Sequence, residues 1–338
     1  KPQMTLRVAI NGYGRIGRNV LRAYFENGAD PALQFVAIND LGDAEALAHL
    51  TRYDSTHGRF AGKVSLTGNM LDINGHTIRL FSMPAPERLP WAELDVDVVL
   101  ECTGQFRARA EAARHLQAGA KKVIIGAAPF DEVDATLVFG VNHDTVQAEH
   151  CIISSVSCTT HALVPLVKIL DEAFGIESGM VTEIHAVTSD QVVLDRTHRD
   201  LRRARAAGVN IIPTTSSSIG ALRRVLPELG ERIEGNSLRV PTQNVAAIDF
   251  SFVSKTAVTV EGINALFAEK AKGDYRRILD YCDELLVSSD FNHSPFSLIF
   301  DATESRVVGR QAKVLVWYDN EWGYANRLLD LCKYLSKE

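Results

Sequence analysis

The 338-residue sequence predicts an α/β fold followed by an α+β fold: a doubly wound parallel sheet comes first, and a domain with a mixed or antiparallel sheet follows. Three observations support this prediction. A buried strand, a glycine-rich turn and a helix open the chain, continuous apolar strands then alternate with helical stretches, and after residue 158 the strands lose this alternation. The length agrees with two domains of roughly 150 residues each.

The start of the chain carries a dinucleotide-binding pattern: residues 6–11 predict a strand, a Gly-x-Gly-x-x-Gly turn follows, residues 18–25 predict a helix, and a strand over 35–39 ends at Asp40. Glycines permit the tight turn and let the backbone approach a pyrophosphate, which free N–H groups at the helix N-terminus bind. Asp40 accepts hydrogen bonds from an adenosine ribose and repels a 2′-phosphate, so NAD is favoured over NADP. The residues assigned to the cofactor are Gly12, Gly14, Arg15, Ile16, Gly17 and Asp40. The alternative is a tight strand-to-helix turn without a ligand.

Two more apolar strands are expected within residues 96–104 and 122–127, with a helix over 107–116 between them. Such alternation implies a sheet covered on both faces, the Rossmann arrangement, whose ligands collect at the carboxyl ends of the strands. Thr103 and Gly104 end the first of these strands. They are therefore candidate walls of the nicotinamide side of the cleft, with ordinary strand-end turns as the alternative.

Cys158 lies where an expected strand, residues 151–156, turns into a helical run over 162–170. Unpaired N–H groups and the helix dipole favour an anion at this place. The thiolate is the form of cysteine that attacks electrophiles. A small, buried and inert cysteine is the alternative.

The sequence after Cys158 predicts a domain of α+β type. The elements expected there are strands at 179–185, 246–253 and 297–301 and a helix at 260–271. A long irregular stretch over 195–213 is rich in arginine, and its interpretation stays open between a solvated surface and an anion site. Residues 317–327 open a final helix that runs through Leu335.

A cofactor domain followed by a candidate thiol suggests oxidation of an aldehyde, because a thiohemiacetal holds the substrate covalently beside the nicotinamide. This chemistry needs a base. His185, at the end of an expected strand, is the candidate that stabilises the thiolate as an ion pair and takes the hydroxyl proton, with a structural histidine as the alternative.

The expected boundaries are 1–157 with the C-terminal helix 318–338 for the NAD-binding domain, and 158–317 for the catalytic domain.

The composition disfavours several classes of protein. A net charge of −6 argues against a nucleic-acid partner. The five cysteines are scattered without a CxxC pair, which suits a reducing compartment and argues against disulfides and a metal site. No early run resembles a signal peptide, and no stretch of about 20 apolar residues is present. We therefore expect a cytoplasmic protein without a membrane partner.

Five segments carry motifs of high specificity. They are residues 9–18, 53–60, 157–160 (Ser-Cys-Thr-Thr), 239–241 (Arg-Val-Pro) and 317–324. Together they resemble the glyceraldehyde-3-phosphate dehydrogenase family almost from end to end. The resemblance implies that Cys158 is the nucleophile, that His185 is its base, and that the substrate is a phosphorylated aldose.

The same resemblance implies further contacts. Asn320 holds the nicotinamide carboxamide, with Tyr324 also on the cofactor side, and Arg205 belongs to a second anion site. The residues assigned to substrate or phosphate are Ser157, Thr159, Thr188, Arg205, Ser216, Ser217 and Arg239. Guanidinium groups bind phosphate oxygens in bidentate fashion, which fits the arginines. A homotetramer is implied as well, with the arginine-rich stretch near a neighbouring subunit's cofactor.

Departures from the family pattern bear on the substrate. Ser217 replaces a glycine of a loop that helps bind attacking phosphate, and His161 replaces an asparagine. Segments such as 89–100 and 290–293 look closer to the erythrose-4-phosphate dehydrogenase branch, whereas 200–207 also resembles biosynthetic glyceraldehyde-3-phosphate enzymes.

Oxidation of D-erythrose 4-phosphate to 4-phosphoerythronate, for pyridoxal phosphate biosynthesis, is therefore the favoured hypothesis. The alternative is a phosphorylating glyceraldehyde-3-phosphate dehydrogenase of glycolysis or gluconeogenesis. Alternatives from other classes are an NAD-binding redox-sensing protein and a cysteine hydrolase.

Overall fold

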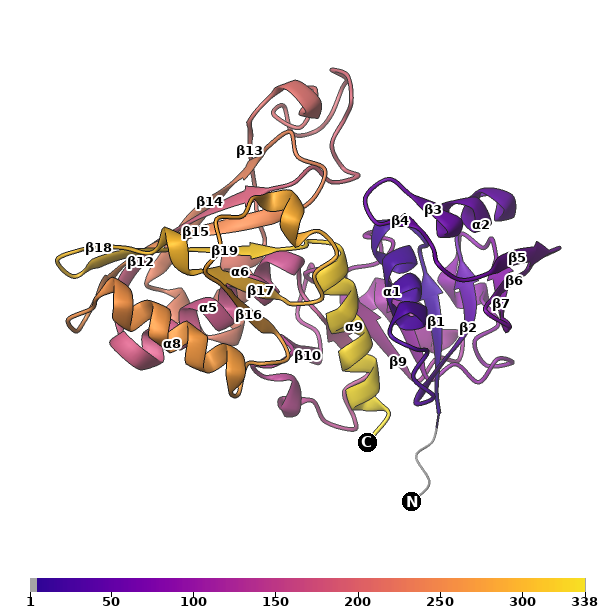
Figure 1. The fold of residues 1–338 in the computed structure, drawn as a ribbon. Coiled ribbons are helices and arrows are strands. Elements are labelled where there is room, and N and C mark those ends of the chain that lie inside the picture. The colour runs from indigo at the N-terminus through magenta and orange to yellow at the C-terminus, as the bar shows by residue number, and fades with distance from the viewer. Residues whose placement is uncertain (1–4, 338) are drawn as a thin grey trace. The chain divides into compact units, whose positions relative to one another are not determined.

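A computed structural model describes residues 5–337 of the chain, so the expected domain ends at 1–4 and 338 lie outside the described part. The chain forms two compact units (Figure 1). One contains the residues up to Val156 and from Ala325 on, and the other is Ser157–Tyr324. The second unit therefore keeps the segment 318–324, which the sequence analysis assigns to the first domain.

The first unit is built on a nine-stranded sheet with the order β10-β11-β9-β8-β1-β2-β7-β6-β5. The seven strands from β10 to β7 in this order are paired in parallel, and β6 and β5 continue the sheet as antiparallel strands. The predicted parallel sheet is thus confirmed. Its strands are β1 Leu6–Asn11, β2 Leu33–Asn39, β5 Val64–Thr67, β6 Met70–Ile73, β7 His76–Phe81, β8 Val98–Glu101, β9 Lys122–Ile125, β10 Ala135–Thr136 and β11 Ile152–Ser154, with a separate hairpin of β3 Tyr53–Asp54 and β4 Gly58–Arg59.

The helices of the first unit follow the strands along the chain. They are α1 Arg15–Glu26, α2 Ala44–Arg52, α3 Arg109–Ala112 and α4 Arg114–Gln117. The single helix expected over 107–116 is two short ones. The chain tightens between them, because the N–H of Leu116 bonds the carbonyl of Ala113, three residues back.

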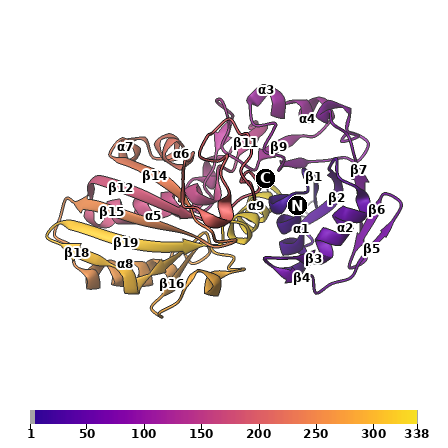
Figure 2. The same cartoon turned by 90° about the horizontal axis from the view of Figure 1, so that it is seen from above.

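The second unit is built on a mixed sheet with the order β13-β14-β12-β15-β19-β17-β16, and β18 pairs with β19. Figure 2 shows the long strands β12, β15 and β19 in this sheet. Strand β15 is antiparallel to both β12 and β19, whereas β12 and β14 are parallel. The strands are β12 Ile176–His185, β13 Ile212–Thr214, β14 Ile233–Arg239, β15 Ala246–Ser254, β16 Leu279–Cys282, β17 Leu298–Asp301, β18 Arg306–Val308 and β19 Gln311–Tyr318.

Helices α5 and α8 lie along one face of this sheet (Figure 1). The helices are α5 Cys158–Phe174, α6 Ser218–Val225, α7 Pro227–Gly230 and α8 Val260–Lys272, and α9 Trp322–Leu335 begins here and ends in the first unit. The final helix starts later than residues 317–327 suggest. Trp317 and Tyr318 end β19, and the Asp319 carboxylate accepts the N–H of Trp322, which caps α9.

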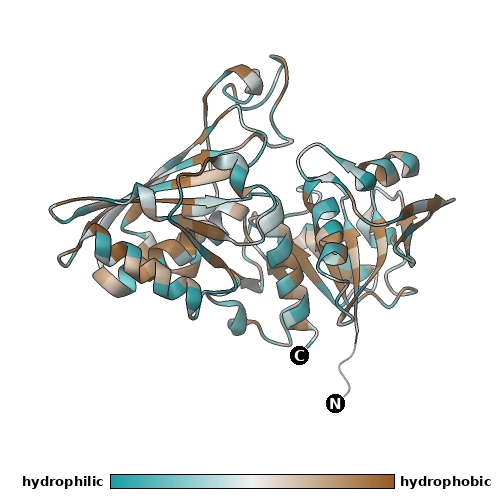
Figure 3. Cartoon of the chain, in the orientation of Figure 1, coloured by the Kyte–Doolittle hydropathy of each residue, from teal (hydrophilic) through white to brown (hydrophobic). Residues whose placement is uncertain are grey.

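Hydrophobic residues gather on the central strands of each sheet, and hydrophilic ones on the outer sides of the helices (Figure 3). Ile10 and Val99 are fully buried in the first unit, as are Phe250 and Val314 in the second. Close-packed interiors of this kind hold the strand ends in fixed positions, and the candidate site residues lie at those ends.

Candidate active site

Cys158 is the first residue of α5, directly after the turn that leaves β11. Val156 in this turn has φ of 49°, a left-handed conformation that is strained for a β-branched residue. Ser157 caps the helix, since its Oγ accepts the N–H of Thr160 at 3.2 Å. The turn and the cap together set the thiol at a helix N-terminus, as the sequence predicts.

His185 is the last residue of β12 and faces this thiol. Its Nε2 lies 3.6 Å from the Cys158 Sγ, and its Nδ1 lies 2.7 Å from the carbonyl oxygen of Ala186. Arg239 Nη1 also lies 3.1 Å from Nδ1. Because the Ala186 carbonyl cannot donate and its contact is the shorter one, we place the proton on Nδ1, which leaves Nε2 as the free acceptor. The imidazole therefore points its basic nitrogen at the sulfur.

Burial governs the protonation of this pair. It raises the pKa of the Cys158 thiol to about 11, although the charge of Arg239 and hydrogen bonds from Thr159 lower it. Burial, joined by the charge of Arg239, lowers the pKa of His185 to about 3. These directions favour a neutral thiol and a neutral imidazole rather than the ion pair that the sequence analysis expects. His185 then takes the proton while the sulfur attacks.

Arg239 is the residue of β14 that lies beside His185 in the parallel register. Its Nη1 donates to the carbonyl of Ala186 at 3.2 Å, and its Nε is buried without a hydrogen-bond partner among the described residues. A buried guanidinium with an unused donor fits a substrate anion. Thr188 follows His185 by three residues in the loop after β12, where its N–H donates to Gln191 Oε1 at 3.2 Å.

The structure separates two arginines of the irregular stretch. Arg205 is paired with Asp195 at 2.8 Å and is 62% exposed at its side chain. The side chain of Arg203 is only 19% exposed, and it donates to Asp190 at 2.7 Å. Burial is the main cause that lowers the pKa of Arg239, and the charge of Arg203 lowers it further. Of the two arginines, Arg203 is thus the one whose charge reaches Arg239. It belongs to the arginine-rich stretch whose interpretation the sequence leaves open.

A buried acid, Glu183, lies in the same strand as His185. The two residues are two positions apart, so their side chains share a face of β12. Glu183 Oε1 accepts hydrogen bonds from the hydroxyls of Ser216, at 2.8 Å, and Ser218. Ser217, between them, is exposed and starts α6. Sequence reasoning missed Glu183, although a charged residue in an apolar strand at this spacing from His185 was a readable signal.

The nicotinamide-side residues of the second unit follow β19. Thr159 and Tyr318 join their hydroxyls at 2.7 Å, which ties α5 to the end of that strand. Asn320 is buried, and its Oδ1 has no hydrogen-bond partner among residues 5–337. A buried amide oxygen of this kind fits the amide donor of a nicotinamide. Tyr324 is buried and packs edge-on against His161, at 5.6 Å between ring centroids.

The glycine loop of the first unit has the shape that a dinucleotide needs. Gly12 has φ of 90°, and a Cβ there would lie 2.7 Å from the backbone nitrogen of Thr103, so only glycine fits. Gly14 faces open space at the start of α1. Asp40 is held at the end of β2, since its carboxylate accepts the N–H of Tyr13 at 2.7 Å. Arg15 pairs with Asp54 at 2.5 Å, Ile16 is half-buried, and a Cβ at Gly17 would strike the Gly12 carbonyl.

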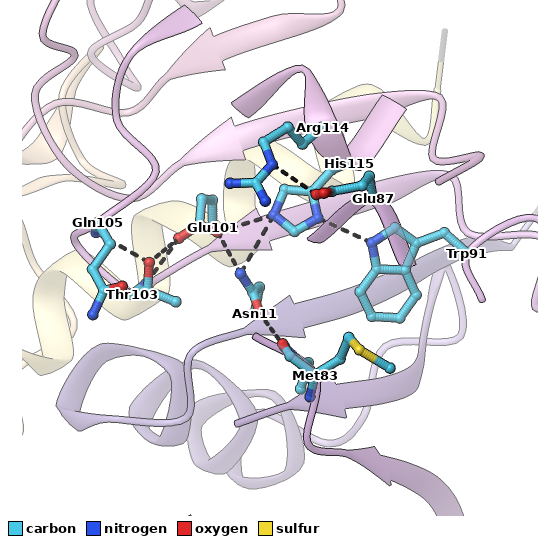
Figure 4. A network of polar contacts seen from close by, with 10 residues as sticks. Asn11, Met83, Glu87, Trp91, Glu101, Thr103, Gln105, Arg114 and His115 are labelled. Atoms are coloured by element: carbon cyan, nitrogen blue, oxygen red, sulfur yellow. Dashed lines mark hydrogen bonds and ion pairs between the residues drawn. The ribbon is translucent and has the colours of Figure 1, made fainter. Parts of the chain in front are cut away.

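A buried polar network holds the end of β8 (Figure 4). Glu101 accepts hydrogen bonds from the Thr103 hydroxyl at 2.6 Å, from Asn11 at 2.5 Å and from His115 Nε2 at 2.9 Å. His115 Nδ1 in turn accepts the indole N–H of Trp91 at 3.0 Å, which requires the proton on Nε2. The network fixes Thr103 beside the glycine loop and leaves Gly104 exposed next to it.

Comparison with known proteins agrees with this geometry. Residues 6–109 match the model of the family described as "Glyceraldehyde 3-phosphate dehydrogenase, NAD binding domain", and residues 157–320 match "Glyceraldehyde 3-phosphate dehydrogenase, C-terminal domain". The chain belongs to the glyceraldehyde-3-phosphate dehydrogenase family. Two relatives from Cupriavidus necator, named "Glyceraldehyde-3-phosphate dehydrogenase, plasmid" and "chromosomal", are each 52% identical over 333 residues, which is 98% of this chain and 99% of theirs.

Family membership makes the chain an NAD-dependent dehydrogenase with a Rossmann domain. In the first unit, the residues that would hold NAD are the glycine loop and Asp40. Over residues 5–337, no three His, Cys, Asp or Glu side chains gather in a metal-binding cluster. None of the described helices combines the length and apolarity needed to cross a membrane.

A substitution His115→Leu should lower the free energy of unfolding by about 2–4 kcal/mol, because it removes one buried donor from the Glu101 carboxylate and leaves the Trp91 N–H without its acceptor. Urea unfolding measures the change. Arg114→Gln is the matched control, since Arg114 is the neighbouring residue but forms a solvent-screened pair with Glu87, whose loss should change the stability much less. Equal losses in the two variants would contradict a structural role for the network.

A substitution Arg239→Gln should move the alkylation of Cys158 by iodoacetamide to higher pH. Only the thiolate reacts, and removal of the positive charge that lowers the thiol pKa makes the thiolate scarcer at any given pH. Mass spectrometry of the Cys158 peptide gives the rate. Arg205→Gln, which removes an exposed arginine, should leave the pH profile in place, and an unchanged profile in Arg239→Gln would show that its charge does not act on the sulfur.

Proposed function

We propose that this enzyme oxidises D-erythrose 4-phosphate to 4-phosphoerythronate with NAD, and that water resolves the covalent intermediate. The observation that carries the proposal is the Ser216–Ser218 segment, whose hydroxyls donate to the buried Glu183 carboxylate. The Ser216 and Ser218 hydroxyls used in this way are not available to an attacking phosphate, which favours water as the acyl acceptor. The product would serve pyridoxal phosphate biosynthesis, as the erythrose-4-phosphate dehydrogenase resemblance implies.

The first step uses the Cys158 and His185 pair. The sulfur attacks the aldehyde carbon while its proton passes to Nε2, 3.6 Å away, and the imidazolium then protonates the resulting alkoxide. The substrate is held on Cys158 as a thiohemiacetal. Arg239, with an unused buried Nε donor, would bind the substrate phosphate, and Arg203 would add positive charge beside it.

The second step leaves a thioester on Cys158. The chemistry that NAD supplies when bound is acceptance of a hydride. His185 takes the hydroxyl proton as the hydride departs and releases it to solvent. His185 then accepts a proton from the attacking water, the carbon–sulfur bond breaks, and the sulfur recovers that proton. The acid loses its remaining proton to solvent and leaves as its carboxylate.

A second candidate is the phosphorylating oxidation of glyceraldehyde 3-phosphate. The printed names of both relatives favour it, at 52% identity over nearly the whole chain. The two candidates share every step up to the thioester. They differ in the length of the aldose and in whether water or phosphate attacks.

Purified enzyme with NAD should therefore turn over erythrose 4-phosphate with a higher kcat/KM than glyceraldehyde 3-phosphate, and added inorganic phosphate should not raise the rate. NADH absorbance and product analysis measure both. A strict phosphate requirement with the triose would replace the proposal by the second candidate. NADH formed in equal amount to the acid excludes the redox-sensing and cysteine-hydrolase alternatives.

Two variants serve as controls for this assay. Cys158→Ser should lower the rate by about a thousandfold or more, because a neutral hydroxyl is a poor nucleophile here. Cys151→Ser removes the thiol of the residue that directly precedes β11, and this variant should keep the wild-type rate. A Cys158→Ser enzyme with most of its activity would remove the covalent mechanism.

We further infer that the enzyme is a cytoplasmic homotetramer. The support is a set of apolar side chains in and beside the irregular stretch, each at least 68% exposed: Val193, Leu194, Leu201, Val209 and Ile211. Apolar surface of this extent is typical of an interface between subunits. Light scattering should give four times the monomer mass, and Leu194→Asp should reduce it. A monomeric wild type would refute the assembly.

A further inference from the structure

Glu183 is a buried carboxylate next to the reactive thiol, and the steps above leave it without a chemical task. It is 2% exposed and lies opposite Ser237 of β14 in the parallel register. Its charge acts on Cys158, whose pKa it raises in addition to the larger effect of burial. A carboxylate placed so close to the nucleophile changes which groups can approach the thioester.

The donors at the start of α6 are consumed around this carboxylate. A serine hydroxyl has one proton to donate, and the Ser216 and Ser218 hydroxyls both contact Glu183 Oε1, while Ser216 Oγ also lies 3.0 Å from Ser218 Oγ. The backbone N–H of Ser218 donates to Ser216 Oγ at 3.2 Å. Three donors at a helix N-terminus, a place that ordinarily attracts anions, are therefore already in use.

The contacts of Glu183 favour its charged form. Two hydroxyl donors converge on one oxygen, which suits an ionised carboxylate because it only accepts. The pKa of Glu183 is nevertheless raised overall, because burial outweighs the hydrogen bonds from Ser218, Ser216 and Ser237 and the charge of Arg239, all of which lower it. A dianionic phosphate that approaches Cys158 from this side would meet the negative charge of Glu183 and two serine hydroxyls that already contact it, but water is neutral.

We propose that Glu183 determines the acyl acceptor: its carboxylate keeps inorganic phosphate away from the Cys158 thioester and so selects water. This inference rests on the proposed function, in which a thioester on Cys158 is hydrolysed. Glu183 takes no proton in the reaction. It acts through its charge and through the orientation of the Ser216 and Ser218 hydroxyls.

The test uses full-length Glu183→Gln and Glu183→Thr enzymes with NAD and whichever of the two aldoses the wild type turns over faster. Glutamine keeps the shape of the side chain without its charge, and threonine suits a strand and frees the serine hydroxyls. Rates are measured with and without inorganic phosphate, and phosphorus NMR separates acyl phosphate from acid. Asp249→Asn is the matched control, because it removes a carboxylate of the same sheet that pairs with Lys313 at 2.7 Å.

In the Glu183 variants, phosphate should raise the rate on the order of tenfold or more and acyl phosphate should accumulate, because one repulsive charge is gone. The rates of the wild type and of Asp249→Asn should not change when phosphate is added. Thermal unfolding and NAD binding check that each variant is folded, and the two substitutions differ enough in size that one serves if the other fails.

The remaining outcomes separate the two proposals. A wild type that needs phosphate overturns hydrolysis and, with it, the role of Glu183. A wild type that ignores phosphate together with folded Glu183 variants that also ignore it overturns only the role of Glu183. A phosphate response of equal size in Asp249→Asn also overturns that role, since it would be a general effect of charge in the sheet.

Discussion

The catalytic unit depends on one contact, the 3.6 Å approach of the Cys158 sulfur to the His185 imidazole. It joins the first residue of α5 to the last residue of β12, so it exists only when a helix start and a strand end meet. The left-handed turn at Val156 and the Ser157 cap aim the sulfur, while the Ala186 carbonyl fixes the tautomer of the imidazole. Strain and hydrogen bonds are thus concentrated where the reaction takes place.

Because Cys158 and His185 are buried, nearby charges strongly affect the protonation of both groups. The thiol and the imidazole rest as neutral groups, so each nearby charge shifts the balance between resting and reactive forms. The charge of Arg239 lowers the pKa of Cys158, and the charge of Glu183 raises it. The cofactor-binding unit also contains a buried carboxylate. Both oxygens of Glu101 accept hydrogen bonds, and these contacts fix the end of β8 at Thr103.

Much of the fold was predictable from local patterns. The first strand, glycine turn and helix came out within a few residues, because glycine conformations and apolar strands are short-range signals. Strands β14 and β19 escaped prediction, since β14 mixes polar and apolar residues and its pairing with β12 is long-range. The helix over 107–116 and the start of the final helix were misjudged, because a helical pattern alone does not show where the chain tightens at Ala113 or where Asp319 caps.

The sequence by itself determined the cofactor fold and the family and singled out Cys158 and His185 as candidate nucleophile and base, because these are carried by contiguous motifs whose residue types have few alternatives. Only the tertiary structure decided how those residues are charged and which others join them. The charge of Arg203 reaches Arg239, and Glu183 came to lie beside Cys158, because the neighbours of a side chain depend on strand register and loop path. Burial, which sets the pKa of the thiol and of the imidazole, is likewise a property of the packed chain and not of any segment.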